Sequence, residues 1–266
     1  QRQMCIRDSD RTERKVSDAD GNKRSATEPS TGERQWSEPM TKERISFMNK
    51  RNYQRELDAL LTDIEKEHKV PRLFLHSCCA PCSSYVLEYL SNYFEITVFF
   101  YNPNISPEEE YRKRVEEIKR LVREMKFEHP VHIEEGSYEP EVFYQMAKGL
   151  EQVPEGGERC FKCYRLRMEE AAKAARDGGY DYFTTTLSIS PLKNAQKINE
   201  IGEELAEIYG VAHLPSDFKK KNGYKRSIEL SHEYDLYRQN YCGCVFSKRE
   251  QERKIQQKQD SENSAS

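Results

Sequence analysis

The placement of cysteine is the feature that most constrains what this chain can fold into. Seven of the eight cysteines fall into three short groups that lie far apart in the sequence. We call them the first cysteine group (Cys78, Cys79 and Cys82), the second cysteine group (Cys160 and Cys163) and the third cysteine group (Cys242 and Cys244). Thiols at such spacings favour metal binding, and seven exceed the four that one tetrahedral ion or one iron–sulfur cube takes. The pattern predicts a cluster together with a second metal or redox site, in an enzyme that moves electrons.

The composition indicates a soluble globular domain with polar ends. Hydrophobic residues make up 36% and charged residues 33% of the 266 residues, and this length can bury a full core. The net charge of −3 provides no global basic field, so RNA binding would need a local patch. No membrane-spanning apolar run and no secretory signal is evident, so we expect a cytoplasmic protein. In a reducing cytosol, grouped thiols indicate metal or catalysis rather than structural disulfides.

Composition divides the chain into three segments. Residues 1–45 are polar with almost no apolar pattern, which predicts a disordered N-terminal tail. The run MCIRDS near its start resembles a cloning or sequencing artefact, so Cys5 is discounted. Residues 46–248 are expected to form a single α/β catalytic domain, and residues 249–266 a polar C-terminal tail with some helical character.

Short apolar runs alternate with amphipathic stretches through the central segment. The apolar runs predict strands at 72–77, 95–102, 131–135, 181–188 and 210–216. The amphipathic stretches predict helices at 83–92, 107–125, 140–150, 160–179 and 193–210. This alternation favours an α/β fold with a parallel sheet flanked by helices.

The first cysteine group follows a predicted strand and precedes a predicted helix. Ligands gather outside the carboxyl ends of parallel strands, and a helix N-terminus lowers the pKa of a thiol. Adjacent Cys78 and Cys79 cannot easily point the same way, so we expect them to serve different centres. The pair Cys79-x-x-Cys82 has a spacing common in iron–sulfur and zinc sites. A thioredoxin-like dithiol would explain this pair but not the other thiols.

The second and third cysteine groups extend the same argument. Cys160 and Cys163 are three residues apart on a predicted helix, so both sulfurs can reach one cluster. Structural zinc is the rival interpretation, but the two C-x-x-C pairs lie much further apart than the roughly 15–20 residues usual in zinc ribbons. Gly243 lets Cys242 and Cys244 bind one ion or form a disulfide. Together with Cys78 they would give three sulfur ligands and the open position of a catalytic metal.

Signals for nucleotide cofactors are missing from the sequence. It contains no Walker lysine loop and no dinucleotide glycine fingerprint, and it also lacks an H-E-x-x-H zinc motif. We therefore expect neither NAD nor ATP as a bound cofactor.

Several longer motifs resemble those of the QueH-type epoxyqueuosine reductases. They are HSCCAPCSS (76–84), YNPNISPEEEYRKR (101–114), GERCFKCYRLRM (157–168), TTLSISPLKN (185–194) and DFKKKNGYKRSIELSHEYDLYRQNYCGC (217–244). The resemblance covers roughly residues 70–248. It implies the last step of queuosine formation, in which the epoxide of epoxyqueuosine at the wobble position of tRNA is reduced to an alkene. It also implies a [4Fe-4S] cluster and a nearby mononuclear metal, iron or zinc, on a sheet of the adenine-nucleotide alpha-hydrolase (HUP) type.

The resemblance also assigns roles to the matching positions. It implies the cluster ligands Cys79, Cys82, Cys160 and Cys163. It implies that the second metal is held by Cys78, Cys242 and Cys244, of which Cys242 and Cys244 would also be catalytic. The roles of Cys78 and Cys79 can be exchanged, and some family members have Asp where Cys82 stands.

The implied reaction consumes two electrons and two protons and releases water. We hypothesise that the cluster relays single electrons from an unidentified donor while the open metal acts as a Lewis acid on the epoxide oxygen. Tyr101, His76 and Asp217 occupy motif positions near predicted strand ends, and the sequence does not choose a proton donor among them. Hydroxyls and a Lys of the TTLSISPLKN motif would hold the substrate, and Ser188 and Asn194 are its assigned residues. Strand packing and a turn at Ser190-Pro191 are the alternative explanation of this motif.

A tRNA partner requires a local basic surface despite the acidic net charge. Cations neutralise phosphates, and aromatic side chains stack on unpaired bases. The segment FKKKNGYKR predicts such a surface from Lys219, Lys220, Lys221, Lys225 and Arg226. Arg165 and Arg167 would assist it. An ordinary solvated loop is an equally weighted alternative.

Two other functions stay open on the sequence. One is a zinc-stapled tRNA-binding module without catalysis. The other is a tRNA sulfur-transfer enzyme, which would normally need a nucleotide to activate the base, and the missing phosphate loop counts against it.

Overall fold

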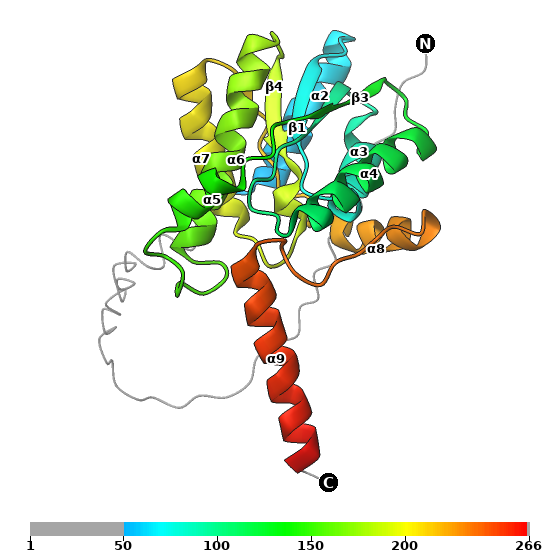
Figure 1. Ribbon diagram of the computed structural model, residues 1–266. Coiled ribbons are helices and arrows are strands. Elements are labelled where there is room, and N and C mark those ends of the chain that lie inside the picture. Colours follow the sequence, from blue (N-terminus) through cyan, green and yellow to red (C-terminus); the bar gives the residue numbers. More distant parts are fainter. Residues whose placement is uncertain (1–50, 265–266) are drawn as a thin grey trace, which may run out of the picture. The chain divides into compact units, whose positions relative to one another are not determined.

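The structure is a computed structural model that describes residues 51–264 (Figure 1). The tail expected at 1–45, with Cys5, lies outside the described residues. In chain order the elements are α2 (Tyr53–Glu67), β1 (Arg72–His76), α3 (Ala80–Leu90), β2 (Glu95–Phe100), α4 (Glu108–Glu124), β3 (Val131–Glu135), α5 (Pro140–Ala147), α6 (Glu158–Asp177), β4 (Tyr182–Thr185), η1 (Thr186–Ile189), α7 (Ala195–Tyr209), β5 (Ala212–His213), α8 (Gly223–Glu233) and α9 (Val245–Ser264).

The five strands form one all-parallel sheet in the order β3-β2-β1-β4-β5. Leu73 of β1 pairs in register with Ile96 of β2 on one side and with Tyr182 of β4 on the other. The predicted parallel, helix-flanked α/β sheet is therefore confirmed, while the finer HUP resemblance stays a prediction. The chain runs outward from β1 in one direction and from β4 in the other. The carboxyl ends of β1 and β4 thus form a topological switch point, where ligands of open sheets bind.

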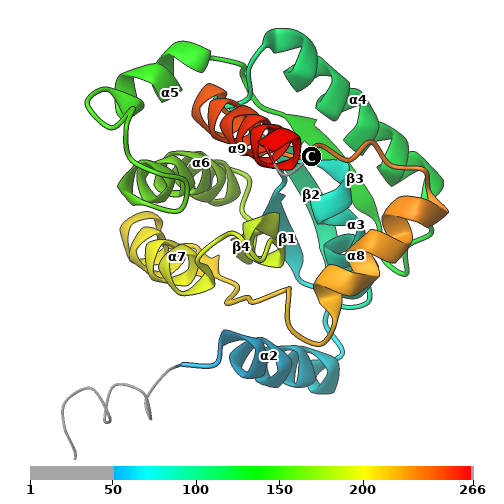
Figure 2. The ribbon, with the colours of Figure 1, turned by 90° about the horizontal axis from the view of Figure 1, so that it is seen from below.

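Alternating side chains of β1 divide the core into two layers. Leu73 and Leu75 pack with apolar residues of α2, α3 and α4. Phe74 points to the opposite layer and packs with α6 and α7. Figure 2 shows α6 and α7 on one side of the sheet and α3 and α4 on the other. Both faces are covered, as parallel strands require, and this explains the nearly continuous apolar sequence of the strands.

Most predicted elements form, and the differences lie at their ends. The helix expected at 83–92 begins at Ala80, because Cys79 acts as its N-cap residue in extended conformation. The strand expected at 181–188 ends at Thr185, whose hydroxyl accepts a hydrogen bond from the Leu187 backbone N–H and starts the short helix η1. The strand expected at 210–216 is reduced to Ala212 and His213.

Two helices were not part of the predicted set, and a third is longer than expected. Helix α2 buries Leu57, Leu61 and Ile64 against the layer that contains α3 and α4. Helix α8 occupies most of the segment interpreted as a basic loop, and it packs on α3. The expected tail at 249–266 lies almost entirely in α9, which is polar along its length. Among the described helices, none combines the length and apolar character that crossing a membrane requires.

His213 is a buried titratable group at the edge of the sheet. It is 8% exposed, and within residues 51–264 neither ring nitrogen has a hydrogen-bond partner. Gly202 of α7 makes room for the ring, because a Cβ atom there would lie 2.3 Å from His213 Nε2. Burial, with a smaller contribution from Arg51, lowers the pKa of His213 to about 3. The folded protein therefore holds this histidine neutral.

We expect the free energy of unfolding to decrease as the pH falls below about 6.5, where His213 of the unfolded chain gains a proton that the folded protein excludes. The contribution is complete above that pH and is lost progressively toward the folded pKa of about 3. Its slope approaches about 1.4 kcal/mol per pH unit. Urea unfolding of the wild type and of His213→Met at several pH values measures this slope. His132→Met, at a site whose side chain is 62% exposed, is the control. Equal slopes for wild type and His213→Met would contradict the prediction.

Candidate metal centre

Each cysteine group lies at the start of a helix. Cys79 is the N-cap residue of α3, and Cys82 lies in its first turn. Cys160 and Cys163 lie in the first two turns of α6. Cys244 directly precedes α9. The unpaired N–H groups and positive dipole ends of three helices therefore meet the thiols, an arrangement that favours thiolate.

The third cysteine group is brought to the switch point by contacts with the segment after β2. The Ser106 backbone N–H donates to the Gly243 carbonyl at 3.0 Å. The guanidinium of Arg114 on α4 donates to the Cys242 carbonyl, also at 3.0 Å. Gly243 has φ +123°, a conformation that favours glycine, and its Cα faces Arg114 and Ile105 closely. These contacts hold residues from the end of the domain beside groups that come from its beginning and middle.

The first cysteine group is compact. The sulfurs of Cys78, Cys79 and Cys82 all lie within 4.8 Å of one another. Cys78 Sγ and Cys79 Sγ are 3.9 Å apart, although neighbouring side chains were expected to point to different centres. The physical reason is that the chain turns from extended backbone at Cys79 directly into α3, which removes the alternation of a strand. Three sulfurs at this spacing can bind one metal centre.

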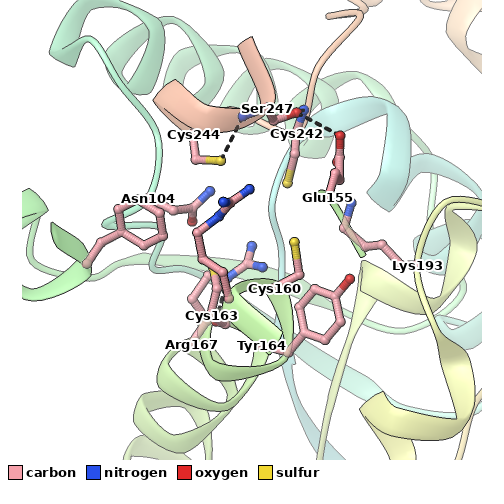
Figure 3. Close-up of a pocket in the computed structure, with 12 residues that line it drawn as sticks. Asn104, Glu155, Cys160, Cys163, Tyr164, Arg167, Lys193, Cys242, Cys244 and Ser247 are labelled. Carbon is pink, nitrogen blue, oxygen red and sulfur yellow. Dashed lines mark hydrogen bonds between the residues drawn. The ribbon is translucent and has the colours of Figure 1, made fainter. Parts of the chain in front are cut away.

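The second and third cysteine groups enclose an inner cavity (Figure 3). Its volume of about 20 Å³ suits a single small occupant. Backbone N–H groups donate to two of the sulfurs: Gly156 to Cys160 Sγ at 3.3 Å and Ser247 to Cys244 Sγ at 3.4 Å. Asn104 also lines this cavity, and its buried Oδ1 has no partner among the described residues.

A larger outer cleft of about 400 Å³ lies next to the inner cavity. The first cysteine group lines it, together with Cys242 and side chains that include Tyr224, Arg238 and Tyr241. Glu155, Lys193 and Cys242 line both spaces, so the two spaces share a wall. A cleft of this size accommodates a small organic group such as a nucleoside.

Buried positive charge accompanies the thiols. Arg167 is 1% exposed, donates from Nε to the Cys163 carbonyl at 3.1 Å, and has no partner for Nη2 in the described part of the chain. Within residues 51–264, neither Arg167 nor Lys193 forms an ion pair with a carboxylate. A buried charge without compensation costs several kcal/mol, on the order of the penalty for a broken buried ion pair. The thiols are the groups in position to supply the negative charge.

The electrostatics of the thiols differ between the groups. Hydrogen bonds from Cys79 and Cys82, assisted by the charges of Lys193 and Arg167, hold the pKa of Cys78 well below its ordinary value. Burial raises the pKa of Cys163 to about 11. Burial, with nearby Cys242, raises the pKa of Cys244 to about 12. Cys78 is therefore the preferred thiolate of the metal-free site.

The donor set fits a thiolate-bound metal or cluster. All seven cysteines of the described residues are free thiols, so the structure holds no disulfide between Cys242 and Cys244. Soft thiolate ligands select iron–sulfur clusters and zinc. A negatively charged metal centre would compensate the buried cation Arg167, and the unpartnered amide oxygen of Asn104 is available to accept from a donor such as a water molecule.

The three predicted proton donors lie outside both spaces. Tyr101 is buried, and its ring stacks on Phe99 with a centroid distance of 5.9 Å. The carboxylate of Asp217 accepts a hydrogen bond from Lys219. His76 contacts the Thr185 hydroxyl at 2.8 Å and the Tyr101 carbonyl at 3.1 Å. Burial, then the charge of Arg167, lowers the pKa of His76 to about 4, so this histidine links strand ends in its neutral form.

Carboxylates neutralise most of the predicted basic surface. The ion pairs are Lys219 with Asp217, Lys221 with Asp58, Arg226 with Glu88 and, at 3.9 Å, Lys225 with Glu229. Lys220 is exposed and forms no ion pair among the described residues. Tyr224, in the first turn of α8, lines the outer cleft, so the segment does lie beside the site.

The two further arginines lie in different surroundings, and only the burial of Arg167 contradicts the expectation. Arg167 is buried and cannot contact tRNA at the surface, so its predicted role is wrong. Arg165 is exposed and forms an ion pair with Glu204 at 2.5 Å. The sequence shows both as cations beside a cysteine motif, and only the helical phase of α6 separates the buried one from the exposed one.

Of the residues expected from the TTLSISPLKN motif, the lysine lines the site, whereas Ser188 and Asn194 do not. Ser188 is buried, and its hydroxyl contacts that of Ser216 at 3.0 Å. Asn194 is the N-cap residue of α7 and accepts from the Lys197 backbone N–H. Lys193, between them, lines both the cavity and the cleft. In the sequence, Lys193 could be recognised by its place between a strand that ends at the switch point and the helix that follows.

The fold and the site together define a class of protein: a parallel α/β protein with a cysteine-rich, metal-competent centre at the switch point of its sheet. Residues 73–250 match the family model described as "Epoxyqueuosine reductase QueH". Curated relatives with that same description agree. The protein of Staphylococcus epidermidis is 46% identical over 202 residues, covering 74% of this chain and 85% of that protein. The protein of Staphylococcus aureus is 45% identical over 206 residues, covering 76% and 86%. The chain belongs to the epoxyqueuosine reductase QueH family.

Similarity also extends to a streptococcal relative and to one solved structure. The epoxyqueuosine reductase QueH of Streptococcus pyogenes is 45% identical over 200 residues, covering 74% of this chain and 78% of that protein. A solved structure named "AtPrR2 in apo form" matches with a TM-score of 0.27 and 19% identity, covering 54% of this chain and 46% of that chain. That structural similarity is too low to assign a fold family.

Ordinary thiols are mostly protonated near pH 7 and react slowly with iodoacetamide. In the metal-free protein at this pH, we expect iodoacetamide to alkylate Cys78 before Cys163 and Cys244. The pKa of Cys78 is lowered, whereas the pKa values of Cys163 and Cys244 are raised by burial. A time course analysed by peptide mass spectrometry measures the order of labelling. Labelling of Cys163 or Cys244 at the rate of Cys78 would contradict this description of the site.

Proposed function

We propose that this chain reduces epoxyqueuosine in tRNA to queuosine, completing the synthesis of that modified nucleoside. Membership of the epoxyqueuosine reductase QueH family supports this activity. The structural observation that carries the proposal is the convergence of three remote cysteine groups on adjoining spaces at the switch point of the sheet. A purely structural zinc site would not need seven thiols beside a cleft of about 400 Å³.

We assign the cofactor ligands as the motifs imply. Cys79, Cys82, Cys160 and Cys163 would hold a [4Fe-4S] cluster, and Cys78, Cys242 and Cys244 a mononuclear iron or zinc ion. Packing does not divide the sulfurs in this way: Cys78, Cys79, Cys82 and Cys160 belong to one apolar cluster, and Cys163 and Cys244 to another. The assignment therefore rests on the family motifs. Because Cys78 and Cys79 lie 3.9 Å apart, their roles can be exchanged. When bound, these groups would supply single electrons and a Lewis acid.

The remaining residues of the site would bind and orient the substrate. Tyr224 and Tyr241 line the outer cleft and can stack on the flat base of a nucleoside that has left the anticodon stack. Arg238, Gln239 and Asn240 line the same wall and offer hydrogen-bond donors and acceptors.

The proton donor remains a proposal among three residues. Tyr101, Asp217 and His76 line neither space, so a proton from any of them would travel through an intervening water molecule.

The HUP-type sheet is likewise a proposal, supported by the strand order β3-β2-β1-β4-β5. ATP use does not follow from it, because the loop after β1 carries HSCCAPCSS where that fold type has a phosphate-binding loop.

We expect the protein, purified and reconstituted with iron and sulfide without oxygen, to convert epoxyqueuosine-tRNA to queuosine-tRNA when a one-electron reductant is added. Nucleoside analysis by mass spectrometry after digestion of the tRNA measures the conversion. Cys242→Ser and Cys244→Ser should each abolish turnover while the visible absorption of the cluster is retained, because both are assigned to the second metal. Unchanged turnover in either variant would refute its assigned role. A colourless protein that binds zinc and tRNA without conversion would instead identify the zinc-stapled binding module.

We also propose that tRNA phosphates contact the basic segment that leads into α8. Exposed ion pairs contribute only about 0–1 kcal/mol, so a phosphate can replace a carboxylate as the partner of a lysine. The cations that contribute most should be those bound most weakly within the protein. These are Lys220, which forms no ion pair in the described chain, and Lys225, whose side chain is 76% exposed.

We expect the double variant Lys220→Glu, Lys225→Glu to bind tRNA about tenfold more weakly or worse. Its affinity should also depend less on salt concentration, because fewer phosphate contacts form and fewer counterions are released on binding. Filter binding at several salt concentrations measures both effects. Lys173→Glu on α6 is the matched control, since its lysine lines neither space at the site. An affinity and a salt slope equal to those of the wild type would remove this segment from the RNA-binding surface.

A further inference from the structure

Lys193 is held at the switch point by a short, hydrogen-bonded loop. The loop follows η1 after the carboxyl end of β4. The Lys193 backbone N–H donates to the Ser190 carbonyl at 3.2 Å, and the Leu192 N–H donates to the Ser190 hydroxyl at 3.3 Å. Asn194 then caps α7. The backbone on both sides of Lys193 is therefore fixed, and the side chain extends from a defined point.

The Lys193 ammonium has no partner within the protein that the structure describes. It takes part in no ion pair and no side-chain hydrogen bond among residues 51–264, although the side chain is half-buried. Other cations of the outer cleft are engaged: Arg238 donates to the Ser231 hydroxyl at 2.9 Å, and Lys254 pairs with Glu250 at 2.9 Å. Lys193 is thus the cation of the cleft wall that is free to bind a ligand.

Lys193 lies where the inner cavity and the outer cleft meet. It lines both the inner cavity and the outer cleft, next to Cys242, which does the same. Figure 3 shows its side chain at the edge of the cavity, among lining residues that include Cys160 and Glu155. A substrate group that lies where the cleft adjoins the inner cavity is therefore next to this ammonium as well as to Cys242.

The surroundings keep Lys193 charged. Burial alone would lower its pKa, but the nearby Cys242 and Cys78, with Tyr164 and Cys82, raise the pKa above its ordinary value. At neutral pH the side chain is positively charged and can donate hydrogen bonds without losing a proton.

We propose that the Lys193 ammonium donates a hydrogen bond to the oxygen of the substrate's epoxide ring and stabilises the negative charge that develops on this oxygen. The inference rests on the proposed function. In the overall reaction both C–O bonds of the epoxide break and a C=C bond forms. Two electrons come from an external one-electron reductant, and the oxygen takes up two protons and leaves as water. A preplaced donor aimed at developing negative charge accelerates such a step, typically by about 100-fold or more.

This role makes a prediction about binding as well as about rate. The substrate carries the epoxide oxygen, whereas the product carries an alkene in its place and offers no oxygen acceptor at that position. The product therefore leaves Lys193 without its hydrogen bond, which weakens product binding relative to substrate. A preference of the protein for epoxyqueuosine-tRNA over queuosine-tRNA is the expected signature.

The first test is equilibrium binding by the cofactor-loaded protein without reductant, so that no substrate is consumed. We expect the wild type to bind epoxyqueuosine-tRNA about tenfold more tightly than queuosine-tRNA, the value of one hydrogen bond to a charged group. Lys193→Met should bind both tRNAs equally, and Lys193→Arg should keep part of the preference. Lys197→Met is the matched control, because Lys197 lies in the first turn of α7, pairs with Glu200 and lines neither space. A preference that survives in Lys193→Met, or that is absent from the wild type, overturns the proposal.

The second test separates this role from charge balance at the metal. With dithionite as reductant, Lys193→Met should lose about 100-fold or more in single-turnover rate, while its KM for epoxyqueuosine-tRNA rises by no more than the roughly tenfold lost in binding. Its iron and sulfide content should equal that of the wild type. Loss of iron in parallel with loss of rate would show that Lys193 only compensates the thiolates, and the proposal would be wrong. Failure of the wild type to reduce epoxyqueuosine-tRNA rejects the proposed function itself. Wild-type rates in Lys193→Met reject only this inference.

Discussion

Balance between buried positive charge and sulfur is the constraint on which the rest of this structure depends. Arg167 is enclosed by the protein without a carboxylate partner, and the N-termini of α3, α6 and α9 add their positive dipole ends. Such a region is stable only when negative charge enters it. Cys78 is placed to supply part of that charge as a thiolate, and binding of a metal would deprotonate thiols from all three parts of the chain. The same positive field suits a centre that receives electrons and acts on an oxygen atom that becomes negative.

The parallel α/β architecture and the position of the site at the carboxyl ends of the strands could be predicted from the sequence, because both follow from patterns among neighbouring residues. The run VHIEE was expected as a strand and is β3 from Val131 to Glu135. Cys78 comes two residues after β1, and parallel strands place their carboxyl ends on one edge. The family resemblance carried by the motifs is confirmed by the match over residues 73–250. These features depend on periodicity and on residues that are neighbours in the sequence.

Other features could not be predicted, because most of them depend on contacts between residues that are remote in the sequence. Lys221 and Arg226 read as a basic patch, but their carboxylate partners Asp58 and Glu88 lie on α2 and α3, more than a hundred residues earlier. Helix α8 forms where a loop was expected, because Gly223 permits a close approach to Tyr85 of α3. The orientation of Cys78 and Cys79 depended on the backbone angles of one N-cap residue. No pattern along the chain encodes these contacts.

The position of the third cysteine group has a consequence for how the enzyme matures. The site takes sulfur from residues 78–82, from the start of α6 and finally from Cys242 and Cys244, near the end of the domain. A growing chain on the ribosome therefore lacks a complete set of sulfur donors until almost the last residue of the domain has been made. Iron delivered earlier would meet partial, exposed thiols. Insertion of the proposed second metal would thus be a late event, because Cys242 and Cys244 are assigned to it.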